Sequence, residues 1–216
     1  MKLPLNFFGL LLISFLFLCS ANMKAQLFDA GFVLGPSFSQ IEGDDVAGYK
    51  RVGINAGVMV EINFSELIIA SMEILYSQKG SSSAFFNTQE FSDDFKIIHE
   101  YVEIPIIVNY QDKGGMNFGA GLVPAYHLRS RLFTLDNEVE EYFQAPDDVK
   151  KWGLAFAVNL SYRINRYSQA NLRWTYDLFP YQDRYSNNRG EIVGQYNNSV
   201  ALRYIFLMSA IGKKKL

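Results

Sequence analysis

The sequence is poor in the residues on which thiol, imidazole and metal chemistry depends. Cys19 is its only cysteine, and His99 and His127 are its only histidines, in a chain of 216 residues. Cys19 lies in an N-terminal segment that we expect to be removed, so the mature chain would have no disulfide and no catalytic thiol. Basic residues are not in excess either, because 20 Lys and Arg stand against 22 Asp and Glu. Without a basic stripe, nucleic acid is not an expected partner.

Residues 1–25 have the pattern of a secretory signal peptide. Lys2 supplies a positive start, Leu5 to Leu18 is a short apolar run, and small residues follow it. Cleavage after Ala21 and cleavage after Ala25 both fit this pattern. We therefore expect the folded protein to begin at about residue 26, outside the cytoplasm.

Two other interpretations of this N-terminal segment are less favoured. The apolar run is short for a membrane-spanning helix. A lipid anchor on Cys19 would want a small residue before it, and Leu18 stands there instead. Removal of Met1 to Ala25 takes Lys2 and Lys24 but no acidic residue, so the formal charge moves from −2 to −4.

Apolar and polar residues alternate across the stretch from Ser71 to Tyr126, around which the rest of the chain is organised. One face of this stretch carries Met72, Ile74, Tyr76, Val102, Ile104, Ile106, Val108, Tyr110, Phe118 and Leu122. Ser, Glu, Lys, His, Asn and Gly occupy the positions between them. A period of two over this length predicts β-strands with one apolar face.

The same alternation predicts eight strands in all. They are expected at 28–39, 52–63, 67–80, 97–110, 116–128, 152–163, 168–180 and 193–207. Long and short connections alternate between them, which is typical of an antiparallel up-and-down transmembrane β-barrel of the outer-membrane type. An even strand number puts both termini on the short-turn, periplasmic side. Pro105 has no N–H group, so we expect a bulge or break in the fourth strand.

Alternation alone does not say which face points outward. A soluble eight-stranded barrel, such as a lipocalin, would turn the apolar face inward. The polar face here is mostly Gly, Ala, Ser and Asn with isolated charges, which suits the narrow interior of a membrane barrel better than a solvated surface. Buried charges need partners. We therefore predict a lumen charge network of Glu61, Glu73, Lys79, Glu103, Arg163, Arg173, Asp177 and Arg203.

Aromatic residues near the strand ends favour the membrane interpretation. Phe38, Tyr76, Tyr126, Trp152 and Tyr176 would form an outer belt, and Phe64, Tyr110, Tyr162, Tyr204 and Phe206 an inner one. Such girdles are expected at the two membrane interfaces.

Five pieces of the sequence together resemble the PorT-like family of outer-membrane β-barrel proteins. They are Gly31 with Gly35, Ser37 and Ser39, then GINAGVMVE at Gly53–Glu61, EILYSQKG at Glu73–Gly80, YVEIPIIVNY at Tyr101–Tyr110 and FGAGLVPAY at Phe118–Tyr126. The resemblance covers nearly the whole mature chain. It implies an outer-membrane location and a barrel, and a link of the family's namesake to protein secretion. It brings no catalytic residue.

His99, His127 and Glu103 are the candidates for metal chemistry. A turn centred near Lys113 would place the two histidines opposite each other, with Glu103 one inward step away. Two imidazoles and a carboxylate can bind Zn²⁺, but a polar rim without metal is the favoured interpretation, and no cofactor is expected. The acidic loop from Asp136 to Asp148 lacks the ligand spacing of a calcium loop.

The sequence thus predicts a signal peptide at 1–25, a barrel domain at 26–208 and a short basic tail at 209–216. Eight strands leave a lumen that side chains fill. A non-enzymatic structural or interaction protein of the outer membrane is the leading hypothesis, with lipid and an envelope or secretion-machinery protein as partners. A small-solute conduit or lipocalin-like carrier is the alternative, and an enzyme at the rim is a third.

Overall fold

The computed structural model describes residues 28–44, 48–82, 95–134, 149–185 and 192–208. Within these ranges the regular structure is entirely β. None of the described segments forms a helix long and apolar enough to cross a bilayer. The predicted signal peptide, the acidic loop and the basic tail lie outside the described residues.

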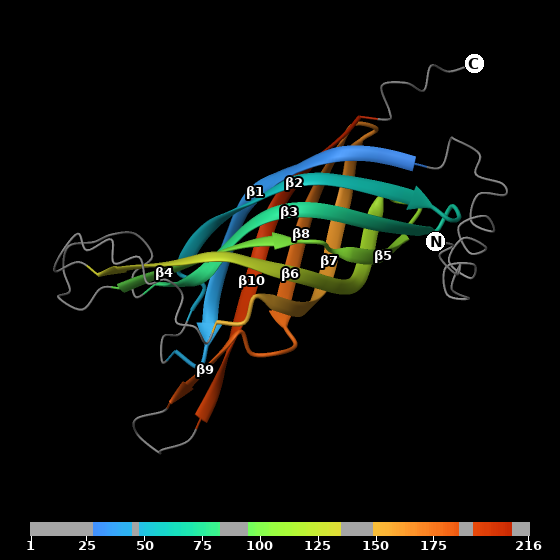
Figure 1. Ribbon diagram of the computed structural model, residues 1–216. Coiled ribbons are helices and arrows are strands. Elements are labelled where there is room, and N and C mark those ends of the chain that lie inside the picture. The colour runs from blue at the N-terminus through green and yellow to red at the C-terminus, as the bar shows by residue number, and fades with distance from the viewer. Residues whose placement is uncertain (1–27, 45–47, 83–94, 135–148, 186–191, 209–216) are drawn as a thin grey trace, which may run out of the picture.

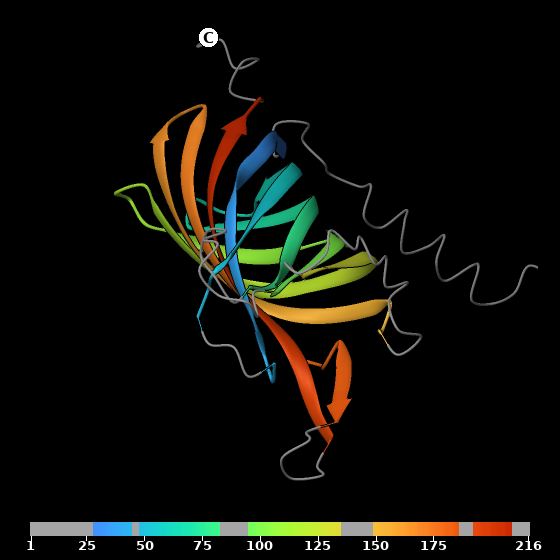
Figure 2. The same ribbon diagram turned by 90° about the vertical axis from the view of Figure 1, so that its left-hand side faces the viewer.

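The strands are β1 (Phe28–Glu42), β2 (Arg51–Asn63), β3 (Ile68–Ser82), β4 (Phe95–Glu103), β5 (Ile106–Gln111), β6 (Met116–Thr134), β7 (Trp152–Asn165), β8 (Ser168–Asp177), β9 (Gln182–Tyr185) and β10 (Ile192–Leu207). Neighbouring strands are antiparallel, and β1 also pairs with β10, which closes the sheet on itself. β4 and β5 are two parts of one barrel strand. The predicted eight-stranded antiparallel barrel is therefore confirmed (Figures 1 and 2).

The chain leaves the strand ladder at Ile104 and Pro105, between β4 and β5. Their backbone groups still find partners: Ile104 N donates to Pro124 O at 2.8 Å, and Pro105 O accepts from Glu73 N at 3.0 Å. Proline has no N–H to donate to a ladder. The break that the sequence predicts at Pro105 is confirmed. β4 before the break and β5 after it both pair with β3 on one side and with β6 on the other.

The apolar face of the barrel points outward. Exposed residues on that face include Phe32, Leu34, Ile54, Val58, Met72, Ile74, Ile106, Val108, Leu122, Leu202 and Tyr204. The opposite face is buried and mostly polar, with Ser37, Ser39, Asn55, Ser71, Ser77, Asn109, Asn117, Asn159, Ser161 and Asn171 among its members. A lipocalin-type barrel has the reverse arrangement, so the carrier alternative loses its structural basis.

One short strand was not predicted from the sequence. Residues Gln182–Tyr185, which were expected to lie in a loop, form β9 and pair with Ile192–Gln195 of β10. This part of β10 lies beyond its last pairing with β8, at Asn198. The β9–β10 hairpin consequently projects from the long-loop end of the barrel (Figures 1 and 2).

A small apolar cluster fills the interior at the long-loop end. Ile41, Val149 and Tyr181 are buried together, and Ile97 packs against them. The Tyr181 backbone is held on both sides, because its N–H donates to Gln195 O and its carbonyl accepts from Lys150 N, both at 2.9 Å. Residues that follow β8 and precede β7 thus pack against β1 and β4 at this end.

Candidate functional site

The centre of the barrel interior is a buried carboxylate shared by two guanidinium groups. Glu73 on β3 accepts two hydrogen bonds from Arg173 on β8, at 2.7 and 3.0 Å, and one from Arg203 on β10, at 2.8 Å. All three side chains are at most 3% exposed. The paired donors of Arg173 match the two carboxylate oxygens, which is the strong, bidentate form of this contact.

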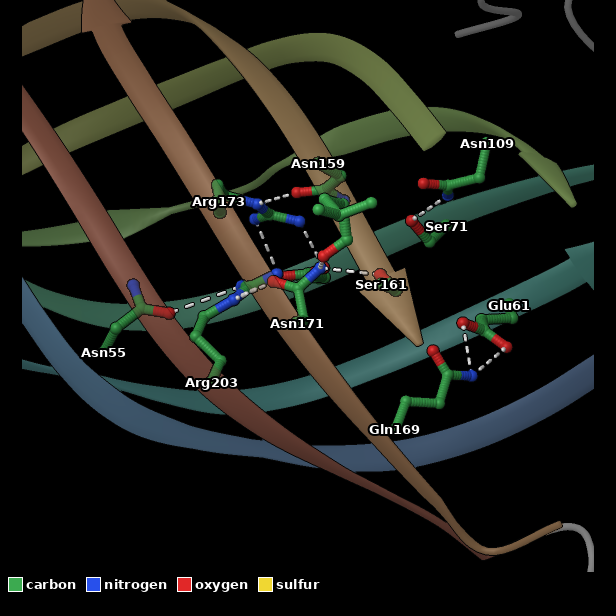
Figure 3. Close-up of polar contacts among 12 residues, drawn as sticks. Asn55, Glu61, Ser71, Asn109, Asn159, Ser161, Gln169, Asn171, Arg173 and Arg203 are labelled. Carbon is green, nitrogen blue, oxygen red and sulfur yellow. Dashed lines mark hydrogen bonds and ion pairs between the residues drawn. The ribbon is translucent and has the colours of Figure 1, made fainter. Parts of the chain in front are cut away.

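Amide side chains hold the two arginines in place (Figure 3). Asn159 Oδ1 accepts from Arg173 Nε at 2.7 Å, and Asn171 Oδ1 accepts from Arg203 Nε at 2.8 Å. Asn171 in turn donates to Ser161 Oγ at 2.7 Å. Asn159 and Ser161 of β7 lie directly opposite Arg173 and Asn171 of β8. The inward faces of these two paired strands therefore supply both Arg173 and the side chains that hold it.

A second group lies toward the long-loop end. Lys79 Nζ is 2.6 Å from Glu103 Oε1, and both side chains are buried. Asp177 faces the same lysine and accepts from Asn197 Nδ2 at 2.8 Å. The Tyr101 hydroxyl completes the group by accepting from Asn197 Nδ2 at 3.1 Å.

A third group lies toward the short-turn end. Glu61 Oε2 is 3.6 Å from Arg163 Nη2, and Gln169 Nε2 lies 3.4 Å from Glu61 Oε1. A polar cavity of about 10 Å³ separates this group from Glu73, lined in part by Ser71 and Asn109. A cavity of that size has room for about one water molecule.

The structure brings all eight sequence-predicted interior residues into these three groups. Four are acids and four are bases, so their formal charges cancel. Desolvated charges are tolerated only when they are paired and hydrogen-bonded. Within the described residues, the charged side chains of the interior are thus arranged in groups that contain both signs.

The two histidines do not lie where the sequence predicted. His127 on β6 is paired across the sheet with Tyr101, and His99 on β4 is paired with Ser130. Two effects move them apart: the turn between β5 and β6 centres on Gly114 rather than Lys113, and the β4–β6 register shifts at Glu100/Tyr101. The prediction that the imidazoles face each other directly is therefore wrong.

The rings still meet, through a serine that sequence reasoning missed. Ser130 Oγ lies 2.6 Å from His99 Nδ1 and 2.8 Å from His127 Nε2, and the ring centroids are 5.8 Å apart. A hydroxyl has one proton, so it donates to one imidazole and accepts from the other. Only the register shift brings Ser130 inward, and a single sequence contains no signal of such a shift.

A metal site does not assemble around these rings. Glu103 is engaged by Lys79 instead. No group of three or more His, Cys, Asp or Glu side chains is placed to hold a metal ion within the described ranges. A serine hydrolase would need an oriented base and oxyanion donors. His99 Nε2 is buried without a hydrogen-bond partner in the described structure, whereas the His127 ring also hydrogen-bonds to the Arg129 backbone.

The chain is similar to several solved outer-membrane proteins at low identity. Ail, the attachment invasion locus protein of Yersinia pestis, is 9% identical, with 83% of this chain and 98% of that chain covered and a TM-score of 0.45. Neisserial surface protein A is also 9% identical, over 83% and 96% of the two chains, with a TM-score of 0.47. OprG of Pseudomonas aeruginosa is 12% identical over 84% and 94%, with a TM-score of 0.37. No curated protein matches the chain.

A family comparison assigns the chain on its own sequence. Residues 22–182 match the family described as "Outer membrane protein beta-barrel domain". The match includes every barrel strand from β1 to β8, with their outward apolar and inward polar faces. The chain belongs to the outer membrane protein β-barrel domain family.

Proposed function

We propose that this protein is a structural or interaction component of the outer membrane, with no catalytic activity, whose barrel anchors a partner-binding surface. Both termini lie on the periplasmic side in this proposal, and the long connections with the β9–β10 hairpin lie outside. The observation that supports it most is the set of buried, ion-paired side chains in the interior. A barrel filled by side chains leaves its two ends as the surfaces on which a partner can bind.

The interior supports an anchor rather than a small-solute conduit. Glu73, Arg173 and Arg203 fill the middle of the barrel. Ile41, Val149 and Tyr181 fill the long-loop end. Between the central and short-turn groups, the cavity of about 10 Å³ has room for about one water molecule.

The identity of the partner rests on the resemblance to the PorT-like family. That resemblance favours envelope or protein-secretion machinery on the periplasmic side. The described residues that would face such a partner are those of the short turns, for example the exposed Glu66 and Lys113. The lipid of the outer membrane is the second partner, along the exposed apolar face.

Photo-crosslinking from both ends of the barrel tests this proposal. A photoreactive amino acid replaces Lys113 at the short-turn end, or the exposed Asp183 of β9 at the long-loop end. A third position, Val108 on the lipid-facing wall, serves as the control. Each variant is irradiated in cells, and crosslinked species are identified by mass spectrometry.

We expect a discrete protein adduct from one end and none from Val108. An adduct with a secretion component from Lys113, together with loss of secreted proteins on gene deletion, supports the PorT-like role. Absence of adducts from both ends, combined with ion conductance of the purified protein in planar bilayers, would overturn the proposal in favour of a conduit.

A further inference from the structure

A small polar cavity lies inside the barrel, between the central group and the short-turn group. It has a volume of about 10 Å³, and its walls come from β2, β3, β5, β6, β7, β8 and β10. All of its lining residues are buried, and the apolar ones among them are Met59, Ile69 and Ile205. The shape of the cavity is thus fixed by strand positions of the closed sheet.

Two hydrogen-bond acceptors at this cavity lack a close donor in the described structure. Asn117 Oδ1 is buried and has no hydrogen-bond partner within the described part of the chain. The polar contacts of the Glu61 carboxylate are long, because Gln169 Nε2 lies 3.4 and 3.5 Å from its two oxygens and Arg163 Nη2 lies 3.6 Å from one of them. Where the protein supplies no close donor, buried acceptors are commonly satisfied by an ordered water molecule.

Two hydroxyl groups at the same cavity have a proton to donate. Ser71 Oγ accepts from Asn109 Nδ2 at 3.3 Å, and Ser161 Oγ accepts from Asn171 Nδ2 at 2.7 Å (Figure 3). These contacts use a lone pair of each hydroxyl oxygen and leave the hydroxyl proton for another acceptor. The cavity is therefore bordered by donors as well as by acceptors.

The groups around Glu61 favour a water molecule over a metal cation in this cavity. The Arg163 guanidinium lies 3.6 Å from Glu61 Oε2, and the Gln169 amide nitrogen faces both carboxylate oxygens. A cation bound to the same carboxylate would be repelled by the guanidinium charge and by the amide hydrogens. A water molecule is neutral, and it can use acceptors and donors at the same time.

We propose that one ordered water molecule occupies this cavity and makes four hydrogen bonds there. It donates to the Glu61 carboxylate and to Asn117 Oδ1, and it accepts from the hydroxyls of Ser71 and Ser161. Buried waters in proteins make about three hydrogen bonds on average. A water-sized cavity with these four partners is therefore well suited to hold one.

The water connects the short-turn group with the central group. Ser161 is bonded to Asn171, Asn171 Oδ1 accepts from Arg203, and Arg203 binds Glu73. With the water in place, hydrogen bonds run without interruption from Glu61 to the Glu73 carboxylate. Displacement of one water molecule therefore weakens both groups.

Nuclear magnetic resonance of the deuterated, detergent-purified protein tests this inference. Cross-relaxation between water and the side-chain amide protons of Asn117 is measured in the laboratory frame and in the rotating frame. A long-lived bound water gives signals of opposite sign in the two frames, whereas direct proton exchange gives signals of the same sign.

Three variants accompany the wild type. S71V fills the cavity, S71A removes the hydroxyl without filling the space, and S77V is the matched control. Ser77 is buried on the same face of β3 and accepts from Asn55 Nδ2 at 3.3 Å, but it does not line the cavity. A gel shift on boiling verifies that each barrel is folded.

Wild type, S71A and S77V should give the opposite-sign signal at Asn117, and S71V should lose it, because the valine side chain takes the space of the water. Loss of the signal in S71A as well would show that the Ser71 hydroxyl proton relays it, and would overturn the inference. Absence of the signal from folded wild type, or an equal signal in S71V, would overturn it too.

A double-mutant cycle tests the bridge independently, and it decides if S71V does not fold. E61A, N117A and the double variant are compared by urea unfolding. A shared water makes their effects on the unfolding equilibrium constant non-additive by roughly twofold or more, whereas additive effects would contradict the bridge. S77A combined with N117A is the control and should be additive. Replacement of sodium by N-methylglucamine should leave the unfolding midpoint unchanged, and a lower midpoint would assign the cavity to a cation instead.

Discussion

Glu73 and Arg173 are joined by a bidentate ion pair across the inside of the barrel, although 100 residues separate them in the chain. Arg203 adds a third hydrogen bond to the same carboxylate. Among the described strands, none of the pairings links β3 with β8 or β10 directly. The ion pair therefore connects opposite walls of the barrel across the lumen. It depends on closure of the sheet rather than on hydrogen bonding between neighbouring strands.

Replacement of Glu73 by Gln should destabilise the barrel strongly. It leaves the charges of Arg173 and Arg203 facing each other without an anion, and loss of one partner of a buried ion pair costs about 3–5 kcal/mol. Urea unfolding followed by tryptophan fluorescence measures the change. Glu66→Gln, in an exposed turn, is the control and should unfold as wild type does. Equal stability of the two variants would show that the Glu73 carboxylate does not stabilise the barrel through its contacts with Arg173 and Arg203.

Gly80 should not tolerate alanine. Its backbone adopts φ +144°, and a Cβ atom there would lie 2.0 Å from the carbonyl oxygen of Ile97. Ser39 also donates to the Gly80 carbonyl, so the strand has little freedom to move away. We expect a lower temperature for the gel-mobility shift. Gly153→Ala is the control, because nothing lies within 4 Å of a Cβ at that position; a loss as large in G153A as in G80A would refute the steric explanation.

The fluorescence of Trp152 should be quenched by brominated lipids in the surrounding membrane. Its side chain is 74% exposed on the outward face, at the predicted outer belt. In a Trp174→Phe background, which leaves one of the two tryptophans, lipids brominated near the headgroup should quench its fluorescence more than lipids brominated near the chain ends. This follows from the preference of Trp for the membrane interface. Quenching by aqueous iodide with no effect of brominated lipid would contradict the membrane orientation.

Ser130 should not behave as a catalytic serine. It contacts two imidazoles, but His99 Nε2 has no hydrogen-bond partner in the described structure, and His127 is held by the Arg129 backbone rather than by a carboxylate among the described residues. An activated serine needs a base that a third group orients. A fluorophosphonate probe should therefore leave the purified protein unlabelled. Labelling that disappears in Ser130→Ala, with the barrel still folded, would reopen the enzyme hypothesis.

The strands and their faces could be predicted because alternation along one strand is a local property. Phe32 and Leu34 are exposed while Val33 between them is buried, as a period of two requires. Pro105 could be interpreted in the same way, because a missing N–H group has a local effect on the ladder. These predictions need no knowledge of which strand lies on the other side of the barrel.

The partners within the interior could not be predicted, because they depend on register and closure. Glu103 contacts Lys79 across the β3–β4 pairing, and the β4–β6 register shift sets Ser130 rather than His127 opposite His99. β9 was not predicted because Gln182–Tyr185 show no apolar alternation of their own. They form a strand by pairing with the extension of β10, Ile192–Gln195. The arginines that bind Glu73 are set by the register of every strand pair around the barrel, because the register fixes the height of each side chain in the lumen.

The pairing of β1 with β10 has a consequence for assembly. The first and last strands of the barrel meet along most of their length, from Gly31 with Leu207 to Glu42 with Tyr196. Until the C-terminal strand arrives, both edges of the sheet display unpaired backbone groups, and an open edge invites pairing with other chains. Arg203, carried by that same last strand, reaches Glu73 only at this moment. Closing the sheet also adds the fourth base to the four acids of the lumen charge network, so a chain that lacks its last strand has neither a sealed edge nor a balanced interior.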